Sequence, residues 1–465
     1  MITLSLAWRN LLRNRRRSLM TLIAMVLGLV AVLLFGGYIR DINYALQSDF
    51  VRLTGHLQIQ HKDYFHFGSG NPAAYGMSRY ERVLEAVKTD PVLAPMLAVA
   101  TPMLQFGAIA GNSSAGVSRT VYVTGVVAED QSRLRQWNGY GLRMLARRLP
   151  LSGSTPDTAV IGTGVARVLQ LCVALKVPDC VAAAPTTREA EGAGLPADIA
   201  ALADPAAPAG PAATSAHPRI EILAANAHGA PNVTALNVLR AEYQGIKELD
   251  DVYVGLHLAT AQKLVFGAAP AQATAIALQV HQTADMPEAR KRLDELLVTR
   301  FKDEPLGIVD FETLNPFYGQ TLAMFAAIFG FISVLIGAIV LFTVSNTMSM
   351  AVVERTAEIG TLRAIGLRRA GIRAIFLSEG VMLGCFGALV GVVAAIALAW
   401  LINLLSFTWI PPGRIEPVPL AVRVVGEHAM ILVSAIGLIV VAALSAILPA
   451  ARAARMSIVE ALRHA

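Results

Sequence analysis

Four long apolar runs constrain the fold of this chain more than any other feature. They cover residues 19–38, 320–344, 375–405 and 428–449. A helix of roughly 20 apolar residues is long enough to cross the hydrocarbon core of a bilayer. The chain is also 55% hydrophobic and only 15% charged, which is too apolar for an ordinary soluble enzyme of 465 residues. The sequence therefore predicts a membrane protein with four spanning helices.

The first run resembles a cleaved signal peptide, because arginines precede it. Its apolar core from Leu19 to Phe35 is longer than the usual apolar region of about 7–15 residues, and no small-residue cleavage site follows before Tyr38. We interpret it as a retained span.

Arginines near the ends of the runs predict the orientation. They cluster before the first run, between the second and third, and after the fourth, and positive residues near span ends favour the cytoplasm. We expect residues 1–18 to form an interfacial helix on the cytoplasmic side, with the loop 345–374 and the tail 450–465 on the same side. Residues 39–319 and the short loop 406–427 are expected outside. This topology explains the net charge of +6 and gives no reason for a nucleic-acid partner.

The outer segment 39–319 is predicted to be an α+β domain on a helical stalk that continues the first span. Its two ends each contain a strand–helix–strand pattern. The first has a strand at 56–60 and a helix capped by Ser78, and the second covers residues 273–311. Between them, further patterns predict a helix at 165–171. Residues 181–218 are rich in alanine, proline and glycine, so we expect a mobile loop there.

Cysteines and histidines give little sign of chemistry. Cys172 and Cys180 are expected outside, where they either close a short disulfide loop or remain two buried thiols. Cys385 is interpreted as a packing residue. Three histidines recur at a spacing of five residues, which suits neither helix nor strand, so no metal site is predicted and all three are expected on the surface: His56, His61 and His66.

Catalytic signatures are absent from the sequence. It contains no G-x-x-x-x-G-K-[ST] phosphate loop, no G-x-S-x-G elbow and no H-E-x-x-H motif. We therefore expect a chain that is not an enzyme and that carries no cofactor of its own.

The charged segment ERTAEIGTLRAIGLRRAGIRAIF, residues 354–376, lies between the second and third runs. Its pattern predicts a helix on which Glu354 and Glu358, four residues apart, share one face. Two like charges on a face are mildly destabilising, so this face suits a basic partner. A solvated amphipathic loop helix is the alternative.

The third run carries two further features. Four glycines lie on one face at a spacing that permits close helix approach, either within the chain or between two copies of it: Gly380, Gly384, Gly387 and Gly391. Glu379 enters the same run near its cytoplasmic edge, where an ionisable group is costly. It either pairs with Arg373 or with an arginine of another helix, or it reaches the interface.

The order of these segments resembles the MacB/FtsX type of ABC-transporter permease, a family that includes lipoprotein-releasing permeases. The resemblance covers essentially the whole chain and rests on LAWRNLLRNRRRSL, ERTAEIGTLRAIGLRRAGI and PAARAARMSIVEALR together with the four-span layout. It implies a bacterial inner-membrane protein whose periplasmic domain has a porter-like part and an inserted second subdomain. It also implies that residues of about 350–366 form a coupling helix that docks on an ATPase. The docking candidates are Glu354, Arg355, Glu358, Ile359, Gly360, Leu362, Arg363 and Gly366.

The resemblance further implies the partners and the function. ATP and Mg would be bound by a separate ATPase dimer, and the chain would pair with a second copy or a homologous permease, with a periplasmic adaptor or lipoprotein as a further partner. ATP-driven motion would then move lipoprotein, lipid or amphipathic cargo. Two alternatives remain: an FtsX-like regulator of a periplasmic enzyme that transports no cargo, and a receptor that has no ATPase.

Overall fold

The computed structural model describes residues 15–68, 70–142, 148–177, 217–245, 247–410 and 417–456. Most of the predicted interfacial helix 1–18, most of the predicted mobile loop 181–218, and Cys180 lie outside these ranges. The chain divides into two compact units. The first, called here the membrane unit, contains residues 1–45, 317–410 and 416–465, and the second, the soluble unit, contains residues 46–316 and 411–415.

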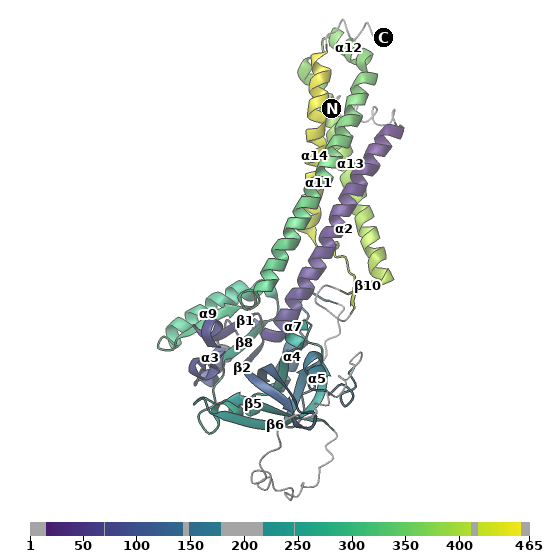
Figure 1. The fold of residues 1–465 in the computed structure, drawn as a ribbon. Coiled ribbons are helices and arrows are strands. Elements are labelled where there is room, and N and C mark those ends of the chain that lie inside the picture. The colour runs from purple at the N-terminus through teal and green to yellow at the C-terminus, as the bar shows by residue number, and fades with distance from the viewer. Residues whose placement is uncertain are drawn as a thin grey trace, which may run out of the picture. The chain divides into compact units, whose positions relative to one another are not determined.

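The membrane unit is built from long helices, shown with the rest of the chain in Figure 1. Its elements are α2 (Arg15–Thr54), which continues into the soluble unit, α11 (Pro316–Glu354), α12 (Thr356–Ala364), α13 (Arg369–Leu405), α14 (His428–Arg455) and the short strands β10 (Thr408–Trp409) and β11 (Val418–Pro419). Four of these helices, α2, α11, α13 and α14, are long and apolar enough to cross a membrane. Each contains one predicted run, which confirms the expected class of membrane protein.

The helices extend beyond the predicted spans. α11 continues to Glu354 and α13 begins at Arg369, so most of the predicted loop 345–374 is helical. The coupling helix expected at about 350–366 is not one element either, because Arg355 separates α11 from α12. Hydropathy marks only the lipid-facing part of a helix, and the polar turns at each end complete it.

Small residues set the packing of α13 against its neighbours. A Cβ added to Gly380 would lie 2.8 Å from the Cβ of Ala446, and one added to Gly384 would lie 3.1 Å from the Cβ of Ala442, both in α14. Gly387 and Gly391 approach α2 instead, at Met25 and Leu29. The glycine face is therefore buried within the chain, and close backbone contact replaces side-chain interdigitation.

Replacing Gly380 by valine should separate α13 from α14. The new side chain would meet the Ala442 carbonyl oxygen, which is 3.1 Å from an added Cβ, and the backbone there cannot move alone. We expect a loss of about 1–3 kcal/mol in the free energy of unfolding. Thermal unfolding of the whole chain in detergent measures it. Gly437→Val in α14 is the matched control, since no heavy atom lies within 4 Å of its added Cβ. Equal losses in the two variants would contradict this packing.

The soluble unit is an α+β fold, which confirms the predicted class. Its strands are β1 (Leu57–His61), β2 (Leu97–Asn112), β3 (Val117–Val126), β4 (Thr158–Gly162), β5 (Arg219–Ala225), β6 (Pro231–Glu242), β7 (Tyr253–His257), β8 (Ala275–Val280) and β9 (Leu306–Asp310). Its helices are α3 (Tyr80–Thr89), α4 (Ala128–Arg135), α5 (Thr163–Val168), α7 (Lys247–Asp250), α8 (Leu258–Phe266), α9 (Met286–Arg300) and α10 (Phe311–Leu314).

The two predicted strand–helix–strand units interleave in one part of the sheet. The unit β1–α3–β2 and the unit β8–α9–β9 give the strand order β2-β8-β1-β9, in which all neighbours are antiparallel. This is the split βαβ arrangement, and α3 and α9 supply buried residues such as Val83 and Leu293 to its core. The predicted Ser78 cap is wrong: α3 begins at Tyr80 without a side-chain cap.

The middle strands form a closed ring that shares β2 with the first part. β2 pairs with both β3 and β5, and the remaining pairs β3–β7, β7–β4, β4–β6 and β6–β5 complete the circle. A separate core that includes Phe106, Val123 and Leu256 fills this ring. The predicted helix at 165–171 is α5, which begins and ends earlier, at Thr163 and Val168.

Candidate functional site: the coupling helix

α12 is a short helix with defined ends, between two helices of the membrane unit. Arg355 is the residue of irregular backbone that separates α11 from α12 (φ −106°, ψ 19°). At the other end, the amide of Leu367 donates to the carbonyl of Leu362 (3.0 Å) and the amide of Gly366 donates to that of Arg363 (3.1 Å). This pair of bonds is the Schellman motif, and it requires a residue at positive φ. Gly366 supplies it with φ +104°, so this glycine ends the helix.

The eight predicted docking residues lie on two different faces of this segment. Those on the outer face are exposed, and those on the inner face are buried or half-buried. The exposed residues are Glu354, Glu358 and Gly366, the buried ones are Arg355, Ile359 and Gly360, and the half-buried ones are Leu362 and Arg363. The helical period produces this division, because positions 355, 359, 362 and 363 recur on one side. The outer face also carries Ile365, which is 80% exposed.

Arg355 forms a buried ion pair with Glu379 of α13. Its Nη1 atom lies 2.9 Å from Oε1 of Glu379, and the two side chains are only 7% and 3% exposed. Glu379 therefore pairs with the arginine between α11 and α12, and its side chain is buried inside the chain. Two charges removed from solvent this far depend on each other, since either one alone would be strongly destabilising.

A second arginine of α12 contacts the end of α14. Nη1 of Arg363 donates a hydrogen bond to the carbonyl oxygen of Met456, the residue after the last turn of α14. Lysine and arginine groups near a helix C-terminus satisfy its last carbonyls and interact favourably with its dipole. Arg355 and Arg363 thus attach the inner face of α12 to α13 and α14.

The remaining sequence candidates add no second chemical centre. Cys172 is buried, and the predicted bridge to Cys180 stays a prediction because Cys180 lies outside the described residues. Cys385 is exposed in the single chain, not packed inside it as expected. Within the described ranges, no group of three or more histidine, cysteine or acidic side chains is placed to hold a metal ion.

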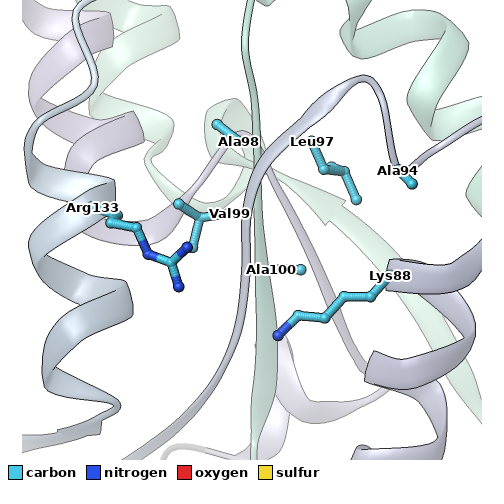
Figure 2. Close-up of a pocket in the computed structure, with 7 residues that line it drawn as sticks. All are labelled: Lys88, Ala94, Leu97, Ala98, Val99, Ala100 and Arg133. Atoms are coloured by element: carbon cyan, nitrogen blue, oxygen red, sulfur yellow. The ribbon is translucent and has the colours of Figure 1, made fainter.

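A pocket in the soluble unit is lined by apolar residues of β2 and the turn before it, together with two basic side chains. Figure 2 shows its two basic side chains, Lys88 from α3 and Arg133 from α4, on either side of the strand. Arg133 is paired with Asp130 of its own helix. The other lining residues are Ala94, Leu97, Ala98, Val99 and Ala100, which carry no titratable side chain.

Comparison with known proteins addresses the region that contains α12. Residues 327–458 match the model of the FtsX-like permease C-terminal domain. An uncharacterized ABC transporter permease of Methanocaldococcus jannaschii is 34% identical over 134 residues, 28% of this chain and 33% of that protein. The macrolide export ATP-binding/permease protein MacB of Bdellovibrio bacteriovorus is 31% identical over 135 residues, 27% of this chain and 20% of that protein. Residues 327–458 therefore form a permease domain that is similar to those of the MacB/FtsX type.

A lipoprotein-releasing permease shows the same level of similarity. The transmembrane protein LolC of Neisseria meningitidis is 31% identical over 114 residues, which is 24% of this chain and 28% of LolC. The matches to these three relatives span only 20% to 33% of their lengths. The permease domain includes α12, Glu379 and the four packing glycines of α13, so every candidate of the membrane unit lies inside the matched region.

Proposed function

We propose that this permease transmits ATP-driven motion from a separate ATPase to its soluble unit. The observation that carries the proposal is that the segment formed by α12 and its junction with α11 has two faces. Its outer face exposes Glu354 and Glu358, and its inner face is attached to α13 and α14 through Arg355 and Arg363. A helix that contacts a partner on one side and the membrane helices on the other is suited to pass on a displacement. The permease itself supplies no catalytic residue in this proposal, and ATP and Mg belong to the ATPase.

The proposed orientation places α12 and both termini in the cytoplasm and the soluble unit in the periplasm of a bacterial inner membrane. The support is the distribution of arginines. α12 is followed by Arg368 and Arg369, and the last turn of α14 contains Arg452 and Arg455.

The proposed cargo is a lipoprotein, a lipid or another amphipathic molecule. The relatives' names point to both kinds of substrate, lipoprotein release for LolC and macrolide export for MacB. We propose that two permeases, either identical or homologous, assemble on an ATPase dimer, with a periplasmic adaptor or lipoprotein as a further partner. The alternative function is that of a regulatory permease, which controls a periplasmic enzyme and moves no cargo.

Reversing the acidic face should uncouple the permease from its ATPase. We expect Glu354→Lys/Glu358→Lys to abolish co-purification of the ATPase with the tagged chain, because a basic docking surface would now meet two positive charges. The protein should remain in the membrane at the wild-type level, since both positions are exposed. Co-purification and ATP-dependent function are measured together.

The matched control is Asp294→Lys/Asp303→Lys, which makes the same change in charge at two exposed positions of the soluble unit. It should leave co-purification unchanged. Normal ATPase binding and normal function in the Glu354→Lys/Glu358→Lys variant would remove the assignment of this face as the docking surface.

A further inference from the structure

We infer that Arg355 and Arg363 are positioning residues that transmit motion from α12 to the α13–α14 pair, and that they are not part of the ATPase-docking surface. The inference rests on the proposed function and divides its coupling helix into two working faces. Both arginines belong to the motif from which docking residues are predicted, and the structure turns their guanidinium groups toward the chain itself.

The location of Arg355 favours transmission. It occupies the only non-helical position between α11 and α12, yet backbone hydrogen bonds run through it: its amide donates to the Ala351 carbonyl (3.2 Å), and its carbonyl accepts from the Ile359 amide (3.0 Å). The irregular residue therefore keeps helix-like backbone hydrogen bonds on both sides. Its side chain attaches the junction to α13 by pairing with Glu379 at 2.9 Å.

Glu379, the partner of Arg355, lies next to a close contact between α13 and α14. The next residue, Gly380, touches α14 at Ala442 and Ala446, where added side-chain atoms would clash. α13 and α14 cannot slide or separate easily at that point, because the backbones are already in contact. A displacement of Arg355 thus moves two spanning helices together.

Arg363 supplies a second point of attachment. It lies eight residues after Arg355, which corresponds to about 12 Å along a helix at roughly 1.5 Å per residue. Its bond to the Met456 carbonyl holds the far end of α12 against the end of α14. One attachment would allow α12 to pivot, whereas two determine its direction relative to the pair. Between them, Ile359 and Leu362 pack into the same core as Ile372 and Ala453.

Chemistry explains why an ion pair suits this role. A buried pair contributes little net stability compared with apolar residues of similar size, but it specifies one partner and one geometry. Arginine is adapted to such a site because its planar group keeps several donors in fixed directions. An apolar contact at position 355 would tolerate sliding, and the Arg355–Glu379 pair does not.

The first arm of the test uses the purified full-length permease alone, in lipid nanodiscs, and measures amide hydrogen exchange in α12. We expect Arg355→Gln to accelerate exchange of the amides in 356–364 by about tenfold or more, because α12 loses its attachment to α13. The reversed pair Arg355→Glu/Glu379→Arg should recover most of the protection, and Arg355→Lys should be intermediate. Arg369→Gln, an exposed arginine at the start of α13, is the control and should have no effect.

The second arm uses the ATPase that the tagged wild-type permease retains during purification from its own cells. Arg355→Gln and Arg363→Gln should retain this ATPase as the wild type does. They should lose most of the difference in hydrogen exchange of the soluble unit between the ATP-bound and nucleotide-free complexes. The reversed pair should restore that difference, which a role in stability alone does not predict.

The outcomes separate the inference from the proposed function. If Arg355→Gln releases the ATPase as completely as Glu354→Lys/Glu358→Lys does, the arginines belong to the docking surface and the inference is wrong, while the proposed function stands. Unchanged exchange in both arms also overturns it. If the wild-type permease retains no ATPase, the proposed function fails and the inference falls with it, although the first arm still reports whether Arg355 anchors α12.

Discussion

Replacement of Gly55 by alanine is expected to lower the free energy of unfolding of the soluble unit by about 2–5 kcal/mol. Gly55 joins the end of α2 to β1 and has φ +78°, in the left-handed region. A Cβ added there would lie 2.7 Å from the carbonyl oxygen and 3.0 Å from the amide nitrogen of Leu278 in β8. These are backbone atoms of a central strand, and the neighbouring His56 amide donates to the same Leu278 oxygen (2.8 Å). The strand cannot withdraw without breaking its pairing with β1.

Gly153→Ala isolates the conformational part of this cost. Gly153 has the same φ of +78°, but no heavy atom lies within 4 Å of its added Cβ. It should cost only about 1–2 kcal/mol, the strain of a left-handed alanine. Denaturant unfolding of the whole chain in detergent compares the two variants. Equal losses would mean that the close approach to Leu278 does not restrict the junction between α2 and β1.

The sequence predicts the parts of the fold that have a local signal. Apolar runs locate the four spanning helices, because a bilayer imposes one length and one composition on each. Alternation and helical period locate β1, α3, β8 and α9 in two strand–helix–strand units, but the interleaving of these units appears only in the structure. The ring of β2, β3, β7, β4, β6 and β5 has no such signal. The ring is closed because β2 pairs with both β3 and β5. A local sequence pattern does not determine which distant strands pair or in what register.

The candidate site is predicted in position but not in orientation. The motif identifies α12 and its flanking residues, and the helical period shows that opposite faces exist. Which face turns inward depends on Glu379, which is 24 positions beyond Arg355 in the sequence. An isolated acid in an apolar run signals a partner, and several arginines are near enough to serve. Only the three-dimensional packing of α13 against the α11–α12 junction selects Arg355.

His56 illustrates a different failure of local pattern. The histidine spacing predicts a surface position, but the His56 side chain is 0% exposed. A single histidine between α2 and the first strand carries no sign of burial. The enclosing groups come from later parts of the chain: Trp137 and Phe311, whose rings meet the imidazole edge to face, and Thr283. Burial here arises from tertiary contacts, and the spacing of the three histidines contains no information about it.

The soluble unit should lose stability as the pH falls from about 7 to about 4, because His56 must be protonated on unfolding. Burial lowers the pKa of His56 to about 4 from the ordinary value of 6.5. Its Nδ1 accepts from the Val280 amide (3.2 Å), so the neutral ring carries its proton on Nε2, which donates to Thr283 Oγ1 (3.1 Å). A second proton, on Nδ1, would face the Val280 amide hydrogen, which is itself a donor.

The sign and the size follow from the two pKa values. Between pH 6.5 and pH 4 the unfolded chain binds more protons than the folded one, so stability rises with pH in this window. The contribution of neutral His56 is fully present above about pH 6.5 and is lost as the pH falls, to a total of about 3 kcal/mol. The carboxyl of Asp90 acts at lower pH, because the hydrogen bonds from Arg292 hold its pKa below the usual range.

Unfolding of the whole chain at a series of pH values, compared with His56→Gln, tests this assignment. The variant should be less stable than the wild type at pH 7 but should lose most of the pH dependence between 6.5 and 4. His257→Gln is the matched control. Burial also lowers the pKa of His257, but this side chain is partly exposed and Asp157 opposes the shift, so its removal should flatten the profile much less. If His56→Gln leaves the dependence of stability on pH unchanged, His56 gains its proton without global unfolding. The residues that enclose it, Trp137, Phe311 and Val280, would then have to separate enough to admit water.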